Sequence, residues 1–479
     1  MAGTDSTPSD EALCDLTAVE LRRLLGERSV SAREVLAAHL RRIERVDPLV
    51  NAIVTRSFER AEGAAAVADE LAASGADLPT LHGLPTAHKD LLDTAGVRTT
   101  YGSTVFADHV PKADDPLVVR LREAGAISLG KTNTPEFGAG SHTFNEVFGL
   151  TRNPWDLGRS CGGSSGGAAV AVACGMVPIA DGSDVGGSLR NPPSFNGVVG
   201  LRPSYGVVPF TGSLASRRRS ATNGPIARTV ADVRLFLSAM AGPYENTPWA
   251  ASIDAAAFAQ VEVDRDRPRR ITLSPDLGGL PVDPEVRAVV HAVADAAADL
   301  GWTVVESDPP LSGADESFEV LRAWEYWAHL GPVLGDRLGE VKATVRQEVE
   351  RGASITGQEL ARAIALETKL LRRTSEWFAD FDVVLAPTSQ VAAFPADQEW
   401  VAEIDGVRFE TYTAWMRSCS RITVTGLPAL SLPGGMTADG RPVGVQLVGP
   451  PRGDLSLLRS AAALEAVIEV PRRPPIVGP

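Results

Sequence analysis

Cys161-Gly-Gly-Ser-Ser-Gly-Gly167, followed by Gly182-Ser-Asp-Val-Gly-Gly-Ser-Leu-Arg190, is the stretch that decides how this chain is interpreted. It sets Ser164 and Ser188 in two glycine-rich turns, 188 − 164 = 24 residues apart. A Gly/Ser cluster on its own is typical of a flexible loop. The neighbouring residues decide between that interpretation and a built site.

Both clusters adjoin predicted secondary structure. The first runs into the small, helix-forming residues 168–174, and the second follows residues 177–181, which have the pattern of a short buried strand. Glycines between a strand and a helix allow backbone N–H groups to converge on one point, as an oxyanion hole requires. The two loops together therefore predict an active site.

A serine nucleophile needs a base. None of the seven histidines sits in a pattern that indicates a triad; they are His39, His82, His88, His109, His142, His291 and His329. Lysine also serves as a base when burial lowers its pKa. Lys89 lies in an apolar, strand-like segment, Gly83-Leu-Pro-Thr-Ala-His-Lys-Asp-Leu-Leu92, of a chain that otherwise prefers arginine. Most lysines are solvated, so the case for Lys89 depends on the two serine loops.

The motifs resemble those of the amidase signature family of serine hydrolases. Beyond the serine loops, the resemblance extends from about residue 15 to about residue 465, through the segments Lys131-Thr-Asn-Thr-Pro-Glu-Phe137, Asn153-Pro-Trp155, Gly200-Leu-Arg-Pro203, Gly224-Pro-Ile-Ala-Arg-Thr-Val-Ala-Asp232, Asp382-Val-Val-Leu-Ala-Pro-Thr388, Gly426-Leu-Pro428 and Gly440-Arg-Pro-Val-Gly-Val-Gln-Leu-Val-Gly449.

The resemblance implies a Ser-Ser-Lys triad. Ser188 would be the nucleophile that forms an acyl-enzyme, and Ser164 would pass protons between Ser188 and Lys89. The family also has a cis peptide bond before the bridging serine, here after Gly163. No metal or cofactor is implied.

Further roles follow from the resemblance by position. The expected oxyanion hole consists of the backbone N–H groups of Val185, Gly186, Gly187 and Ser188. We expect supporting, positioning roles for Ser165, Asp184 and Arg190.

Substrate selection is expected at two places. Gly138, Ala139 and Gly140 fall in the family's acyl-pocket loop, where missing side chains would leave room for a bulky or aromatic substrate. Residues 311–380 are helical and aromatic and would form a cap. On a helix Trp324 and Trp327 could share a face, either toward the substrate or in the core of the cap.

The chain departs from the family pattern at Cys161, where proline is common, at Pro193, where a small residue is usual, and at Thr423, where asparagine is frequent. None of the three belongs to the expected triad. We expect them to affect loop shape and the substrate pocket.

Two motif matches point elsewhere. Gly125-Ala-Ile-Ser-Leu-Gly-Lys-Thr132 fits the phosphate-binding loop, but residues 115–124 predict a helix that ends at Gly125, and 127–129 predict a strand. Gly162-Gly-Ser-Ser-Gly166 fits the nucleophile elbow, which needs a later acidic residue and histidine in suitable contexts. Both matches are interpreted as accidental.

Composition and charge limit the classes of partner and of cellular setting that the chain fits. The net charge of −14, from 60 acidic and 46 basic residues, disfavours nucleic acid as a partner, and the one basic run, Arg217-Arg-Arg219, is typical of a solvated loop. Four cysteines without zinc or disulfide spacing favour a reduced, cytoplasmic setting. Residues 1–10 lack the features of a signal peptide, and no apolar run is long enough to span a membrane.

The predicted fold is α/β: one large domain, 1–479, with a mixed sheet of many strands between helical layers and a helical cap. Within it we expect N-terminal helices at 15–75, with capping boxes at Thr17 and Ser31, the signature core at 80–235 and the cap at 311–380.

The predicted function is hydrolysis of non-peptide aryl or alkyl amides, with esters and carbamates (urethanes) as further small-molecule substrates, by a monomer or homodimer. One alternative is the amidase subunit of a tRNA-dependent amidotransferase. That subunit usually has a more serine-rich segment where this chain has Phe137-Gly-Ala-Gly-Ser-His-Thr-Phe144. A second alternative is a non-catalytic binding protein, which the intact Lys89, Ser164 and Ser188 disfavour.

Overall fold

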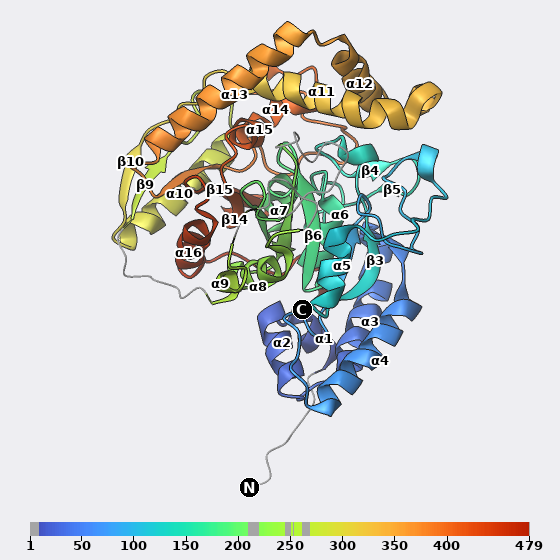
Figure 1. The fold of residues 1–479 in the computed structure, drawn as a ribbon. Helices are drawn as coiled ribbons and strands as arrows, with labels where there is room; N and C mark the ends of the chain where they lie inside the picture. The colour runs from blue at the N-terminus through green and yellow to red at the C-terminus, as the bar shows by residue number, and fades with distance from the viewer. Residues whose placement is uncertain (1–8, 209–219, 245–250, 252, 261–268, 479) are drawn as a thin grey trace.

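A mixed sheet runs through the molecule (Figure 1). The computed structural model describes residues 9–208, 220–244, 251, 253–260 and 269–478. In this part of the chain the sheet has eleven strands in the order β1-β3-β2-β6-β8-β7-β14-β15-β11-β9-β10. Their bounds are β1 Ile53–Arg56, β2 Pro85–Lys89, β3 Ile127–Thr132, β6 Ile179–Asp184, β7 Val199–Arg202, β8 Thr222–Ala227, β9 Arg270–Leu273, β10 Thr303–Glu306, β11 Val383–Pro387, β14 Ala429–Met436 and β15 Pro442–Val448. The predicted mixed α/β sheet is confirmed.

Helices pack on this sheet in two groups. Helices α6 (Gly166–Ala173) and α7 (Asn191–Asn196) contact each other and the central strands, while α8 (Val230–Met240), α10 (Pro284–Asp299) and α16 (Asp454–Glu465) form the other group. All eight residues of α6 are glycine, alanine or valine, and all are buried. Small side chains let this helix lie close to the strands and fix the loop that precedes it.

The amino-terminal helices gather at one end of the molecule (Figure 1). They are α1 Asp10–Asp15, α2 Ala18–Gly26, α3 Ala32–Val50 and α4 Phe58–Ser74. The capping boxes expected at Thr17 and Ser31 are both present: each hydroxyl accepts the N–H of a glutamate three residues on, and that glutamate accepts the N–H of the cap residue.

The phosphate-loop match is confirmed as accidental. Helix α5 (Pro116–Glu123) ends just before Gly125, whose φ of 90° suits a residue without a Cβ. Strand β3 then continues through Lys131 and Thr132, where a phosphate-binding loop would open a helix. Lys131 is buried and donates to a backbone carbonyl, that of Leu92.

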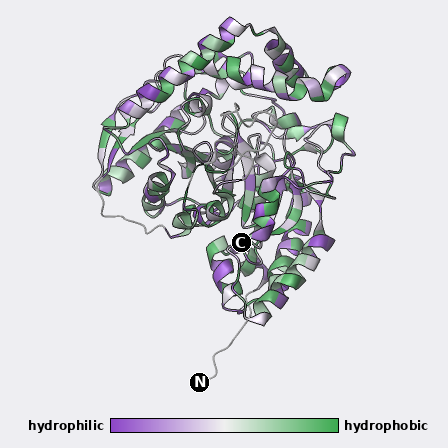
Figure 2. Ribbon diagram, viewed as in Figure 1, coloured by the Kyte–Doolittle hydropathy of each residue, from purple (hydrophilic) through white to green (hydrophobic). Residues whose placement is uncertain are grey.

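Three helices form the cap: α11 (Ala314–Leu334), α12 (Ala343–Ser354) and α13 (Gly357–Trp377). They arch over the end of the molecule opposite the amino-terminal helices (Figure 1). Figure 2 shows hydrophobic and hydrophilic residues mixed along them, as expected for helices with one face against the protein and one outward. The inward face includes Tyr326 and Leu330, which pack with Ala139.

The remaining elements are short. They are α9 Ala256–Ala259, α14 Tyr412–Trp415, α15 Arg417–Thr423, the hairpin strands β4 Phe144–Asn145, β5 Gly149–Leu150, β12 Glu403–Ile404 and β13 Val407–Arg408, and the 3₁₀ turns η1 Thr104–Phe106, η2 Glu136–Gly138, η3 Gly335–Glu340 and η4 Pro475–Val477.

The structure can be compared with the sequence predictions about the basic run, the amino terminus, the cysteines and membrane spans. The basic run at 217–219 and residues 1–8 lie outside the described residues. All four cysteines are buried and none forms a disulfide. None of the helices in the described ranges has the length and apolarity needed to cross a membrane.

Candidate active site

Lys89 lies at the end of β2 and contacts three serine hydroxyls. Its Nζ is 2.7 Å from Ser164 Oγ, 2.9 Å from Ser165 Oγ and 3.0 Å from Ser183 Oγ. The first two serines precede α6, and the third lies on β6, which pairs in parallel with β2. The peptide bond between Gly163 and Ser164 is cis. The structure therefore brings together Lys89 and the two serines of the first glycine-rich loop, and it adds Ser183, which was not predicted from the sequence.

Burial favours the neutral form of the Lys89 amine. The side chain is 1% exposed, and desolvation lowers its pKa from 10.5 to about 7, although the carboxylates of Asp184 and Asp181 work in the opposite direction. The carboxylate of Asp181 already has two other partners: it accepts the backbone N–H of Lys89 at 2.9 Å and contacts His88 Nδ1 at 2.5 Å. The lowered pKa favours the neutral amine, which is the form that can accept a proton.

Ser165 supports this arrangement without facing the large cavity described below. Its hydroxyl donates to the Ser183 carbonyl at 3.3 Å and accepts the Ser183 N–H at 3.4 Å. The side chain is fully buried. The supporting role expected for Ser165 stays a prediction.

Ser188 lies on the loop between β6 and α7 and faces open space. It is 8% exposed, and its hydroxyl makes no hydrogen bond to any residue that the structure describes. Two cavities meet at this residue. The larger of them also contains Lys89 and Ser164.

The loop before Ser188 presents free amide groups. Within the described chain, no acceptor takes the backbone N–H of Val185, Gly186 or Ser188. Gly187 differs, because its N–H donates to Asp184 Oδ1 at 2.8 Å. Of the four N–H groups expected to form the oxyanion hole, three have no acceptor in the described chain, and the fourth braces the loop. Gly187 must be glycine, since its φ is 129° and a Cβ would lie 2.6 Å from Cys419 Cβ.

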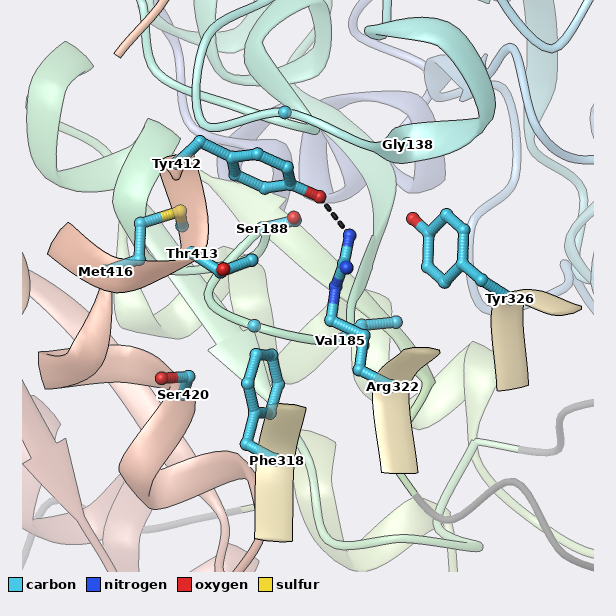
Figure 3. A pocket seen from close by; sticks show the side chains of 12 residues that line it. Gly138, Val185, Ser188, Phe318, Arg322, Tyr326, Tyr412, Thr413, Met416 and Ser420 are labelled. Atoms are coloured by element: carbon cyan, nitrogen blue, oxygen red, sulfur yellow. Dashed lines mark hydrogen bonds between the residues drawn. The ribbon is translucent and has the colours of Figure 1, made fainter. Parts of the chain in front are cut away.

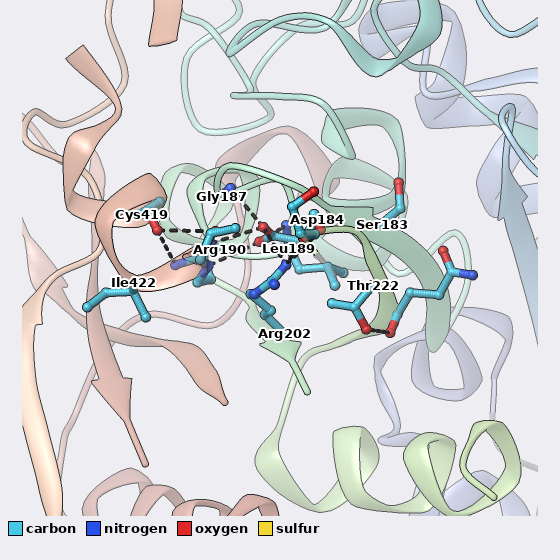
Figure 4. Close-up of polar contacts among 12 residues, drawn as sticks. Ser183, Asp184, Gly187, Leu189, Arg190, Arg202, Thr222, Cys419 and Ile422 are labelled. Atoms are coloured by element: carbon cyan, nitrogen blue, oxygen red, sulfur yellow. Dashed lines mark hydrogen bonds and ion pairs between the residues drawn. The ribbon is translucent and has the colours of Figure 1, made fainter. Parts of the chain in front are cut away.

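Asp184 anchors this loop through buried charges (Figure 4). Its carboxylate accepts the Leu189 N–H at 3.0 Å, contacts Arg190 through two nitrogens, each at 3.0 Å, and contacts Arg202 Nη1 at 3.4 Å. Burial alone would raise the pKa of Asp184, but the two guanidinium groups hold it well below its usual range. These contacts link Asp184 and Arg190 to the loop that carries Ser188, and the positioning roles expected for them stay a prediction.

Arg190 extends the anchor to the carboxy-terminal part of the chain. It donates to the Cys419 carbonyl at 2.9 Å, to Gln446 Oε1 at 2.7 Å and to Thr423 Oγ1 at 2.9 Å. Thr423, where the chain departs from the family pattern, is therefore one of the residues that hold Arg190 and, through it, the loop that carries Ser188.

The residues expected from the sequence to contact the substrate lie in different surroundings. Gly138 lines both cavities and Gly140 lines the smaller one, whereas Ala139 is fully buried among cap residues. On the cap, Tyr326 lines both cavities, while Trp327 is 41% exposed and belongs to neither. The prediction for Trp327 is therefore wrong in either form, and Tyr326 is the residue of this group that faces the site.

Comparison with known proteins agrees with the fold and the motif. The sequence profile of the family described as Amidase matches residues 34–458. An acylamidase of Rhodococcus erythropolis is 37% identical over 469 residues, which cover 94% of this chain and 95% of that protein. A subunit of the glutamyl-tRNA(Gln) amidotransferase of Moorella thermoacetica is also 37% identical, over 489 residues and 97% and 99% of the two chains.

Solved structures give the same picture. A bacterial aryl acylamidase of the amidase signature family superposes with a TM-score of 0.88 at 27% identity, covering 94% of this chain and 96% of the other. The chain belongs to the amidase signature family.

Proposed function

We propose that this protein is a self-sufficient amidase that hydrolyses small, non-peptide amides through Lys89, Ser164 and Ser188. The observation that supports it most directly is the 2.7 Å contact between buried Lys89 Nζ and Ser164 Oγ, beside a nucleophile-type serine that faces a cavity. An acylamidase among the relatives agrees with this reaction class.

The proposed reaction begins with proton transfer. Neutral Lys89 accepts the proton of Ser164, which takes the proton of Ser188 as the latter's oxygen attacks the amide carbonyl carbon. Negative charge then develops on the carbonyl oxygen, and in this proposal the N–H groups of Val185, Gly186 and Ser188 bind it. The C–N bond breaks as Ser164 gives a proton to the departing amine and regains one from protonated Lys89, which leaves the amine of Lys89 neutral again.

Hydrolysis of the acyl-enzyme completes the cycle. A water molecule in the place vacated by the amine attacks the ester and gives a proton to Ser164, which passes its own proton to Lys89. The C–O bond to Ser188 then breaks, Ser188 takes a proton from Ser164, and Lys89 returns the proton that it held to Ser164. The same steps apply to esters and aryl carbamates, whose carbonyl carbon is attacked in the same way. All of these steps use side-chain and backbone groups of this chain.

The alternative function is that of an amidotransferase subunit, because such subunits match this chain as closely as the acylamidase does. Its triad chemistry would be the same, with ammonia passed to a partner. The cavity of about 430 Å³ that Gly138 and Ser188 line favours the stand-alone enzyme, since it leaves room for a substrate larger than an amino-acid amide.

The test is release of p-nitroaniline from p-nitroacetanilide, and of p-nitrophenol from a matched aryl carbamate, without ATP, tRNA or metal. We expect turnover by the wild type and loss of at least 10³-fold in Ser188→Ala. The control Ser29→Ala removes an exposed hydroxyl and should retain full activity. Activity that survives in Ser188→Ala would refute the assigned nucleophile. An inactive wild type that gains activity with amidotransferase partners would favour the alternative.

A further inference from the structure

Ser188 separates two cavities of very different size. The one that contains Lys89 and Ser164 has a volume of about 430 Å³. The other, on the side of Gly140 and Gly186, has only about 20 Å³ (Figure 3). A substrate bonded to Ser188 therefore has a wide side and a narrow side.

The chemistry assigns one part of the substrate to each side. In the proposed mechanism the departing nitrogen receives its proton from Ser164, so the amine must lie in the cavity that contains Ser164. The acyl substituent and the nitrogen point away from each other across the carbonyl carbon. The small cavity is also lined by Val185 and Gly186, whose amides bind the carbonyl oxygen in the proposed mechanism, so we place the acyl group beside that oxygen in the small cavity.

The volume of each cavity indicates the size of the substrate group that it can hold. A single water needs roughly 10–15 Å³ on the same scale, so about 20 Å³ admits one or two carbon atoms beyond the carbonyl. The large cavity has room for a ring system. Part of its wall is aromatic, because Tyr101 stacks with Phe137 at 6.4 Å between ring centroids and Phe106 packs edge-on against Phe137 at 6.1 Å.

Arg322 lines the small cavity. The side chain is buried, with its guanidinium carbon 4.3 Å from the Tyr326 ring centroid and 5.2 Å from that of Tyr412, whose hydroxyl accepts one of its N–H groups (Figure 3). It is also ion-paired with Glu348 at 2.5 Å. Cation–π contacts on two rings and a buried ion pair hold the group in place.

A third cavity lies behind this wall. It has about 720 Å³ and shares with the small cavity the residues Phe318, Arg322, Tyr412 and Thr413. These residues therefore form a partition, and the acyl side is short because of them, although there is space beyond. Since Glu348 already balances the charge of Arg322, the partition favours an uncharged acyl group.

We propose, building on the proposed amidase function, that the enzyme selects short, uncharged acyl groups on bulky aromatic amines. The partition built on Arg322 and completed by Phe318, with Met416 beside the small cavity, sets the limit on acyl length.

The test measures kcat/KM for the acetyl, butanoyl and hexanoyl amides of p-nitroaniline. We expect the wild type to lose at least tenfold from acetyl to hexanoyl, because each extra methylene in a closed pocket costs about tenfold or more. Phe318→Ala and Met416→Ala enlarge the small cavity without removing a charge, and each should raise the hexanoyl-to-acetyl ratio at least tenfold. Arg322→Ala should do the same if it folds.

The control is Trp327→Ala, on the same helix but outside both cavities, which should leave the ratio unchanged. A wild type that cleaves hexanoyl as fast as acetyl overturns the inference while leaving the proposed function intact. So does an unchanged ratio in both Phe318→Ala and Met416→Ala. Failure of the wild type to cleave any of the three amides overturns the proposed function, and with it this inference.

Discussion

The substitution Asp184→Asn tests whether the oxyanion loop is held by buried charge. In the wild type the carboxylate accepts five contacts: the N–H groups of Gly187 and Leu189, two nitrogens of Arg190 and one of Arg202, at 2.8–3.4 Å. Asparagine has nearly the same shape, but one of its two polar atoms is an N–H donor that would face other donors.

The expected loss of stability follows from this geometry. Asp184 is fully buried and both arginines are at most 1% exposed, so the substitution leaves two guanidinium groups without their counter-charge inside the protein. Breaking a buried ion pair by removing one partner costs about 3–5 kcal/mol. That is a large part of the roughly 5–15 kcal/mol by which folded domains are stable.

Two measurements check the prediction. Urea unfolding should show the free energy of unfolding lowered by about 3–5 kcal/mol. On the folded fraction, kcat/KM for p-nitroacetanilide should fall about 100-fold, as for loss of one oxyanion donor, because the loop that presents Gly186 and Ser188 loses its anchor.

The matched control is Asp439→Asn, the same chemical change in an exposed ion pair with Arg441. It should change the free energy of unfolding by less than about 1 kcal/mol. If Asp184→Asn unfolded at the same urea concentration as this control and kept wild-type activity, the anchoring role of Asp184 would be wrong.

Two further predictions concern the base and the acyl loop. Burial lowers the pKa of Lys89 to about 7, so about a tenth of the amine is neutral at pH 6 and about nine-tenths at pH 8. We therefore expect kcat/KM to rise about ninefold between these two pH values. A rate profile that is flat over this range would contradict the prediction. The unfolded chain holds this proton up to about pH 10.5, so the contribution of Lys89 to the free energy of unfolding should increase from about pH 7 to 10.5. Gly138→Ala should lower kcat/KM about tenfold, since the new Cβ would lie 3.4 Å from Ser164 Oγ and 3.1 Å from Leu91. Gly440→Ala has a similar positive φ and open space around it, so it should share the stability loss of about 1–2 kcal/mol but keep full activity.

The sequence was most informative where chemistry imposes a short, rigid pattern. The two glycine-rich loops located Ser164 and Ser188, because a backbone that converges on a substrate needs glycine at fixed positions. The helix caps at Thr17 and Ser31 could also be predicted from the sequence, since a capping box is a contact between residues three positions apart.

Ser183 was missed although a signal for it exists. Alternate residues of a strand face the same side, so Ser183 shares the face of Asp181, which contacts Lys89. The strand predicted from the sequence ended at Asp181, whereas β6 continues to Asp184. Extending the strand by two residues would have placed a third hydroxyl beside the lysine.

The wall of the acyl cavity had no comparable signal. Arg322 and Tyr412 are 90 residues apart and meet only because the cap helix α11 and the short helix α14 pack on the same site. The spacing of Trp324 and Trp327 pointed to a shared helical face. It could not say which face the cap would turn inward, because that is set by the long-range packing of Tyr326 and Leu330 on Ala139.

The anchoring of the nucleophile loop has a consequence for biosynthesis. The whole Gly/Ser motif lies in the first half of the chain, yet Arg190 finds its acceptors at Cys419, Thr423 and Gln446. A nascent chain can therefore present Lys89, Ser164 and Ser188 long before it can hold their loop in shape. We therefore expect the loop that carries Ser188 to reach its final shape, and hydrolytic activity to appear, only after residues 419–446 have been synthesised.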